Sequence, residues 1–99
     1  MIVEYSADDG LRLSNPNDFR NFKLLVKGGR DEDLPETDGI SFVDDHNALI
    51  AVSLVPTLPG CPDDESWRAS YLAMIEAARK YGWIDAHANA IRTHIERSP

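Results

Sequence analysis

The spacing of apolar residues is clearest in the last third of the chain, where it predicts a C-terminal pair of helices within residues 63–97. In the first helix, large apolar side chains recur every three or four positions, which is the period of a helix with one buried face; they are Trp67, Tyr71, Met74, Ile75, Ala78 and Tyr81. This helix begins at Asp63 or Asp64, and bases follow in its last turn, as the helix dipole favours. Gly82 predicts a left-handed stop, beyond which Trp83 can fold back on the last turn.

The same reasoning predicts a second helix at the end of the chain. Asp85 is placed to cap it, and its apolar stripe is formed by Ile84, Ala88, Ile91 and Ile95. Because Ile91 lies in the middle of this stripe, we expect it to be buried against the preceding helix or against the sheet.

Shorter segments of strand-forming residues predict two β-hairpins. Residues 2–5 and 11–13 flank an Asp-Gly dipeptide, which is typical of a tight hairpin turn. Residues 40–43 and 49–55 flank a turn rich in Asp and Asn. The strand 49–55 is apolar on both faces, as central strands often are.

The segment between the hairpins has two interpretations. Asn15 and Pro16 resemble a helix start, and Phe19, Phe22 and Val26 recur at helical spacing before a Gly-Gly pair. The alternative is a short helical turn followed by a strand over residues 22–27. A short apolar run does not decide between them, so we expect the longer helix and leave residues 22–27 open.

Together these segments predict one α+β domain over residues 1–99. Its small antiparallel sheet would have about four strands from the two hairpins, with one intervening helix and two C-terminal helices packed on one face. Residues 28–39 form an acidic segment whose only large apolar residue is Leu34, and we expect a mobile loop there. The other sheet face, with Leu11, Leu13 and one side of the strand 49–55, is expected to keep apolar area that a partner or a second copy covers.

Charge excludes some classes of partner. The net charge is −7, divided into −9 over residues 1–65 and +2 over residues 66–99. An acidic surface repels phosphate backbones and anionic membranes, so we predict neither a nucleic-acid nor a membrane partner. The longest apolar run, residues 48–52, is far shorter than the ~20 residues that cross a bilayer. The N-terminus has no cationic region and there is one cysteine, which together predict a cytoplasmic protein without a signal peptide.

Cysteine and histidine residues offer little chemistry. Cys61 lies just before a helix start, where the pKa of a thiol can fall, but the three acids that follow it disfavour a thiolate. His87 and His94 are seven residues apart on the predicted last helix, about 10.5 Å along its axis. That spacing is too long for one metal ion, and His46 lies in a distant turn.

Two acidic segments resemble sites in composition only. The run from Asp31 to Asp38 fails as a calcium loop in both registers, because the glycine position holds an acid in each. The turn 44–47 contains a carboxylate and an imidazole, but these residue types are also common in hairpin turns, and no nucleophile accompanies them. We therefore expect no catalytic, cofactor-binding or metal-ligating residue and no cofactor.

The function predicted from these observations is a non-catalytic cytoplasmic module that binds another protein or assembles with itself. A small-molecule- or metal-binding accessory domain is the alternative, and a small enzyme that depends on its thiol or a histidine ranks third. The aromatic residues of the C-terminal third are expected in the core. If one remains exposed, we expect it to be Trp83, because it lies at the turn between the predicted helices.

Overall fold

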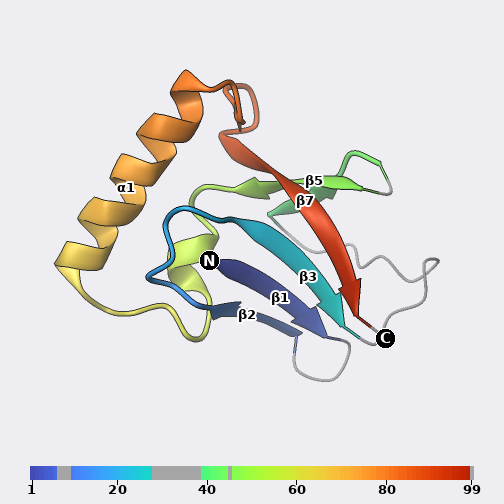
Figure 1. Ribbon diagram of the computed structural model, residues 1–99, viewed down its shortest axis with the longest axis horizontal. Coiled ribbons are helices and arrows are strands. Elements are labelled where there is room, and N and C mark those ends of the chain that lie inside the picture. The colour runs from blue at the N-terminus through green and yellow to red at the C-terminus, as the bar shows by residue number, and fades with distance from the viewer. Residues whose placement is uncertain (7–9, 28–38, 45, 99) are drawn as a thin grey trace.

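One α-helix and seven β-strands form the computed structural model of the protein, which describes residues 1–6, 10–27, 39–44 and 46–98 (Figure 1). In chain order the elements are β1 (Ile2–Ser6), β2 (Gly10–Ser14), β3 (Lys23–Lys27), β4 (Ile40–Phe42), β5 (Asn47–Ala51), the 3-10 turn η1 (Val55–Thr57), α1 (Glu65–Lys80), β6 (Ile84–Asp85) and β7 (Ala90–Ser98). The radius of gyration of 12.9 Å is that of a compact single domain of this length.

The strands form one mixed sheet that curls into a half-barrel, with the order β2-β1-β3-β7-β5-β4. β1, β3 and β7 are parallel neighbours, while β2, β4 and β5 pair antiparallel. β6 pairs with β7 at residues 90–91, and β3 pairs with β7 at residues 94–98. Because β5 occupies the opposite edge of β7, β6 and β3 share one edge and leave a gap between them at residues 92–93.

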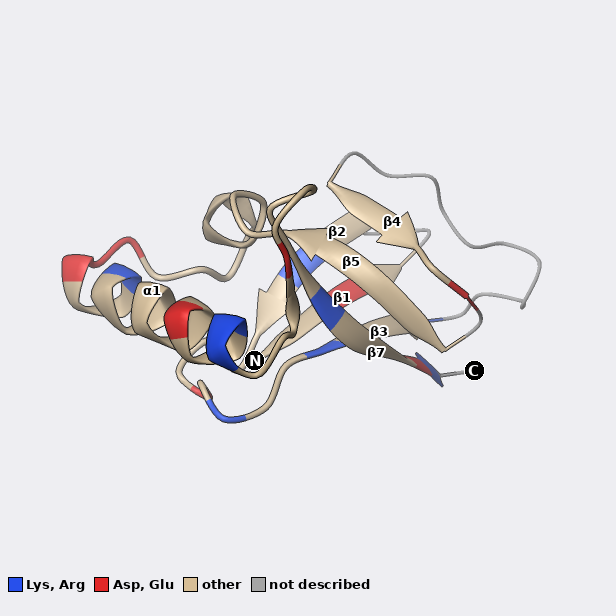
Figure 2. Ribbon diagram, turned by 90° about the horizontal axis from the view of Figure 1, so that it is seen from above, with Lys and Arg blue, Asp and Glu red and all other residues tan. Residues whose placement is uncertain are grey.

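Two rows of apolar side chains fill the inner face of the sheet. Cross-strand pairing aligns Val3, Leu13, Leu24 and Ile95 in one row, and Ile40, Ile50 and Ile91 in the other. All seven are buried, and each such side chain contributes about 1.5–3 kcal/mol by leaving water. α1 lies across the end of the sheet where β1 and β3 begin (Figures 1 and 2), and it adds Trp67, Tyr71 and Ile75 to the same core.

The first predicted C-terminal helix is confirmed as α1, including both of its ends. The Asp64 side chain accepts a hydrogen bond from the backbone N–H of Ser66 at 3.0 Å, so Asp64 is the N-cap. Gly82 has φ +79°, the left-handed conformation expected of the stop. The N–H of Trp83 then donates to the carbonyl of Ala78 at 3.0 Å and folds the chain back on the last turn.

The second predicted C-terminal helix is wrong, because residues 84–98 form β6 and β7. Ile91 and Ile95 are four residues apart, a spacing that satisfies a helix stripe and also one face of a strand. The residues between them decide the outcome, because Ile91, Thr93 and Ile95 are buried and alternate with exposed Arg92 and His94. Burial of Ile91, as predicted, is confirmed, but in a strand of the sheet.

The long helix expected after Pro16 is also wrong, and the alternative strand is correct. β3 covers residues 23–27 and places Leu24 and Val26 inside, while Lys23 and Lys27 lie on the other face. The parallel pairing with β1 and β7 supplies backbone partners that a local pattern does not reveal. Both hairpins are confirmed as β1–β2 and β4–β5, although β5 ends at residue 51 and not at 55.

The fold class is therefore corrected from four strands with three helices to seven strands with one α-helix. The predicted apolar outer face is corrected in part, because Leu11 and Leu13 lie on the inner face, whereas half-buried Leu49 lies on the outer face. Alternation along the strands places charged side chains on the outer face, among them Arg12, Lys23, Lys27, Arg92 and Glu96. The predicted mobile loop lies outside the described residues except for Gly39, and no described helix is long and apolar enough to cross a bilayer.

Candidate binding site

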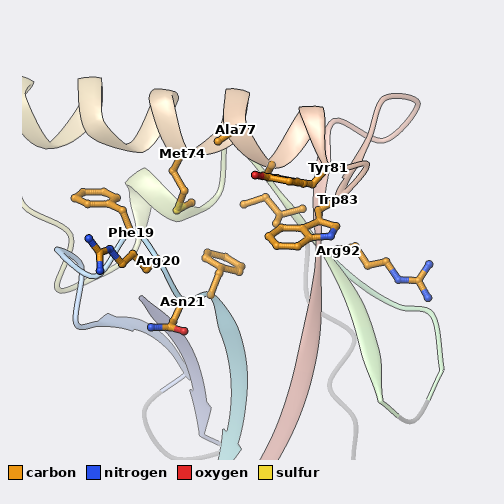
Figure 3. Close-up of a pocket in the computed structure, with 11 residues that line it drawn as sticks. Phe19, Arg20, Asn21, Met74, Ala77, Tyr81, Trp83 and Arg92 are labelled. Atoms are coloured by element: carbon orange, nitrogen blue, oxygen red, sulfur yellow. The ribbon is translucent and has the colours of Figure 1, made fainter.

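A pocket of about 350 Å³ opens between the C-terminal half of α1 and the gap in the sheet (Figure 3). Its lining is mostly aromatic and aliphatic: Phe19, Arg20, Asn21, Phe22, Met74, Ala77, Ala78, Tyr81, Trp83, Ile91 and Arg92. Ligand pockets in proteins range from about 300 to 1,000 Å³. This pocket is at the small end of that range, a size that suits one or two side chains.

Hydrogen bonds from β7 hold both sides of the gap in place. On one side the N–H of Arg92 donates to the carbonyl of Trp83 at 2.8 Å. On the other side the hydroxyl of Thr93 donates to the carbonyl of Phe22 at 3.0 Å. Consecutive residues of β7 therefore bind opposite sides of the gap, and Ile91 and Arg92 of β7 line the pocket there.

The turn that leads into β3 is fixed by the N-terminal ammonium group. The Met1 ammonium donates to the carbonyls of Asp18 and Asn21, both at 2.8 Å, and Met1 is buried. Burial is the main cause that lowers the pKa of this ammonium group. These contacts hold residues 18–21 in place, and with them the side of the pocket formed by Phe19.

Two exposed aromatic residues form the mouth of the pocket. Tyr81 is 73% exposed and Trp83 is 57% exposed, and their ring centroids are 5.5 Å apart. By contrast, the α1 residues Trp67 and Tyr71 are buried, and their stacked rings have centroids 5.1 Å apart. The expectation that these aromatics lie in the core is correct for Trp67 and Tyr71 and wrong for Tyr81 and Trp83, although Trp83 was the residue named for exposure if any of them was exposed.

Arginines lie at opposite ends of the pocket, and Figure 3 shows their guanidinium groups directed away from its centre. Arg20 and Arg92 are both exposed, and neither forms an ion pair with a described residue. The lining includes no acid. The nearby Asp18 carboxylate already accepts hydrogen bonds from the Asn21 amide and the Arg20 backbone N–H, which lower its pKa.

Cys61 lies outside this pocket and is half-buried. Its Sγ lies 3.6 Å from the carbonyl oxygen of Pro62. Burial raises the pKa of the thiol, and Asp63 raises it further, although Arg68 opposes both. A raised pKa keeps the sulfur protonated at neutral pH, which is the opposite of an activated nucleophile.

The histidines do not converge either. His87 lies in the turn between β6 and β7, His94 on the outer face of β7, and His46 in the turn before β5, all exposed. The ~10.5 Å helix spacing predicted for His87 and His94 is wrong, because that segment is not helical. Among the residues that the structure describes, no group of three or more His, Cys, Asp or Glu side chains is placed to hold a metal ion.

In the turn before β5, the Asp44 carboxylate stabilises the turn itself, as the hairpin interpretation predicts. One Asp44 oxygen accepts hydrogen bonds from the backbone N–H groups of His46 and Asn47, at 2.7 and 2.8 Å. These contacts lower the pKa of Asp44, the His46 N–H most strongly. The carboxylate therefore binds backbone in an Asx-type turn. The acidic run of residues 31–38 lies outside the described residues.

The sequence did not predict that several of the residues lining this pocket come together. Phe19 and Phe22 were predicted on a helix stripe, and no prediction was made for Arg20, Asn21 or Arg92. The available signal was the Tyr81-Gly82-Trp83 sequence, because two large aromatics on either side of a helix stop cannot both follow the buried stripe.

Comparison of this chain with protein-family models, with curated proteins and with solved structures finds no match.

Proposed function

We propose that this protein is a non-catalytic interaction module, and that it binds an apolar side chain of a partner protein in the pocket between α1 and β7. The observation that carries the proposal is the exposed pair Tyr81 and Trp83 at the mouth of a pocket lined mostly by apolar side chains. Exposed aromatics beside a hollow are typical of the residues that dominate binding energy at protein interfaces. Their rigid rings also lose little conformational entropy on binding.

A small-molecule site is the second candidate, and the pocket volume alone is compatible with it. Such sites usually add a few polar groups that converge on the ligand. Here the polar lining residues are Arg20, Asn21 and Arg92, and the two guanidinium groups point away from the centre in Figure 3. The arrangement favours a side chain that enters from a chain lying across the mouth.

The test is a selection of peptides from a random heptapeptide display library on the immobilised protein, repeated with Trp83→Ala. We expect the wild-type protein to select peptides with a large apolar residue. Removal of a central Trp from such an interface should weaken binding by about 30-fold or more.

Leu72→Ala is the matched control, because Leu72 is 58% exposed on α1, the helix that precedes Trp83, and does not line the pocket. Binding that survives this change but not Trp83→Ala supports the proposal. Peptides that bind Trp83→Ala as well as they bind the wild type would refute it. Equal unfolding midpoints for the three proteins establish that the comparison reports binding.

A further inference from the structure

The charge around the pocket is opposite in sign to the charge of the whole protein, which is −7. Arg20 and Arg92 stand free of described ion pairs at its two ends. Asp18, two positions before Arg20, lies 3.9 Å from the Met1 ammonium and accepts hydrogen bonds from the Arg20 backbone N–H and the Asn21 amide. The site therefore presents uncompensated positive charge on both sides of an apolar centre.

The placement of these cations constrains the ligand. They lie at opposite ends of the pocket with their guanidinium groups directed outward (Figure 3), so one small anion in the pocket does not reach both. An extended chain does, because its residues advance about 3.3 Å each and can place acids on either side of a central side chain. Arginine also binds carboxylates with paired N–H groups.

We propose that the pocket binds an extended protein segment in which one large apolar residue is flanked on both sides by acidic residues. This inference rests on the proposed function and specifies its partner. The apolar side chain fills the pocket beneath Tyr81 and Trp83, and the flanking carboxylates meet Arg20 and Arg92. Exposed ion pairs are screened by salt, so the preference for acids falls as ionic strength rises.

Three fluorescein-labelled heptapeptides test the proposal by fluorescence anisotropy. The first is Gly-Glu-Glu-Phe-Glu-Glu-Gly, the second replaces every Glu with Gln, and the third replaces Phe with Ala. Two exposed ion pairs favour the acidic peptide by about tenfold over the Gln peptide at low salt. We expect that ratio to shrink in 0.5 M NaCl and the Ala peptide to bind far more weakly.

Variants of the protein locate the charge effect. Arg20→Gln and Arg92→Gln should each weaken the acidic peptide by about two- to fivefold and leave the Gln peptide nearly unchanged. Arg20→Lys and Arg92→Lys retain the charge and should keep the salt dependence. Arg79→Gln is the matched control, because Arg79 does not line the pocket and pairs with Glu76 at 3.6 Å.

The outcomes separate this inference from the proposed function. If the acidic and Gln peptides bind with equal affinity and both require Trp83, the proposal of acidic flanking residues is wrong, but the proposed function as an interaction module is supported. If peptide binding is indifferent to Trp83→Ala, both are wrong. Light scattering of the protein alone tests whether a second copy of the chain occupies the pocket. A molecular mass that rises with concentration in the wild type but not in Trp83→Ala would assign the pocket to a second copy and would refute a separate partner.

Discussion

Glu4 is the most deeply buried acid that the structure describes, although its side chain belongs to the outer face of the sheet. It is 6% exposed, and its carboxylate pairs with the Lys27 ammonium and accepts a hydrogen bond from the Ser14 hydroxyl. These contacts, the one from Lys27 first, lower the pKa of Glu4 below its ordinary value of 4.5. The three residues come from β1, β2 and β3, so the cluster ties three neighbouring strands together.

We predict that Glu4→Gln lowers the free energy of unfolding by about 1–3 kcal/mol at pH 7, because charge-assisted hydrogen bonds are lost from a buried group. Urea unfolding measures the change. Glu96→Gln is the matched control, since Glu96 also pairs with a lysine of the neighbouring strand, Lys23, but is 46% exposed. Glu96→Gln should lower the free energy of unfolding by less than about 1 kcal/mol. Equal losses in the two variants would contradict the role assigned to burial.

The same cluster predicts a dependence on pH. Because the folded-state pKa of Glu4 is depressed, its stabilisation is present above about pH 4.5 and is lost as pH falls through the folded-state pKa. The difference in unfolding free energy between wild type and Glu4→Gln should therefore shrink as the pH falls from 5 towards 2. A difference that is constant over this range would show that Glu4 acts through packing alone.

At the scale of elements, the chain after η1 protects the exposed edge of β2. The N–H of Leu13 donates to the carbonyl of Pro59 at 2.7 Å. Gly60 makes this approach possible, because its φ is +92° and an added Cβ would lie 2.2 Å from the Leu13 carbonyl oxygen. The edge strand is thus covered by a loop, which is one way that sheets avoid pairing with other chains.

We predict that Gly60→Ala destabilises the protein more than Gly82→Ala, as measured by thermal or urea unfolding. Gly82 also has a positive φ, +79°, but nothing lies near its missing Cβ. Gly82→Ala should therefore cost only the conformational strain of about 1–2 kcal/mol. Gly60→Ala adds a clash with backbone, and an equal or smaller loss at Gly60 would show that the loop does not pack on β2 as described.

The strand β7 holds the sheet together, because it pairs with β3, β5 and β6. We predict that Ile91→Ala costs about 2–5 kcal/mol of unfolding free energy, the usual range for a buried isoleucine. His94→Ala in the same strand is exposed and should change stability by less than about 0.5 kcal/mol. A loss below that value at Ile91 would contradict its burial in the sheet.

The elements differ in how far the sequence reveals them. α1 was predictable because its cap, its apolar stripe and its glycine stop are all local. β3 and β7 were not, because their apolar residues also fit a helical period, and their backbone partners lie far away in the sequence. Ile91 and Ile95 illustrate this, since only the buried Thr93 between them breaks the helical pattern in favour of alternation.

At the scale of the whole molecule, the pocket is assembled from segments that no local pattern connects. Phe19 and Phe22 precede β3, Met74 comes from α1, Tyr81 is the C-cap of α1, and Ile91 comes from β7. Their meeting depends on the parallel pairing of β3 with β7, which the predicted antiparallel sheet did not contain. The sequence therefore singles out Trp83 as the aromatic residue to expose, but not the hollow beside it.

The most direct test of this account is a two-dimensional ¹H–¹⁵N NMR titration of the protein with the acidic Phe peptide. The chain has two tryptophans, and the indole N–H of Trp67 is hydrogen-bonded to the Pro16 carbonyl at 2.7 Å in the core. The account predicts that the Trp83 indole signal shifts progressively while that of Trp67 stays nearly fixed. Saturating shifts confined to the outer face around Arg12 and Lys27, with Trp83 unmoved, would contradict it.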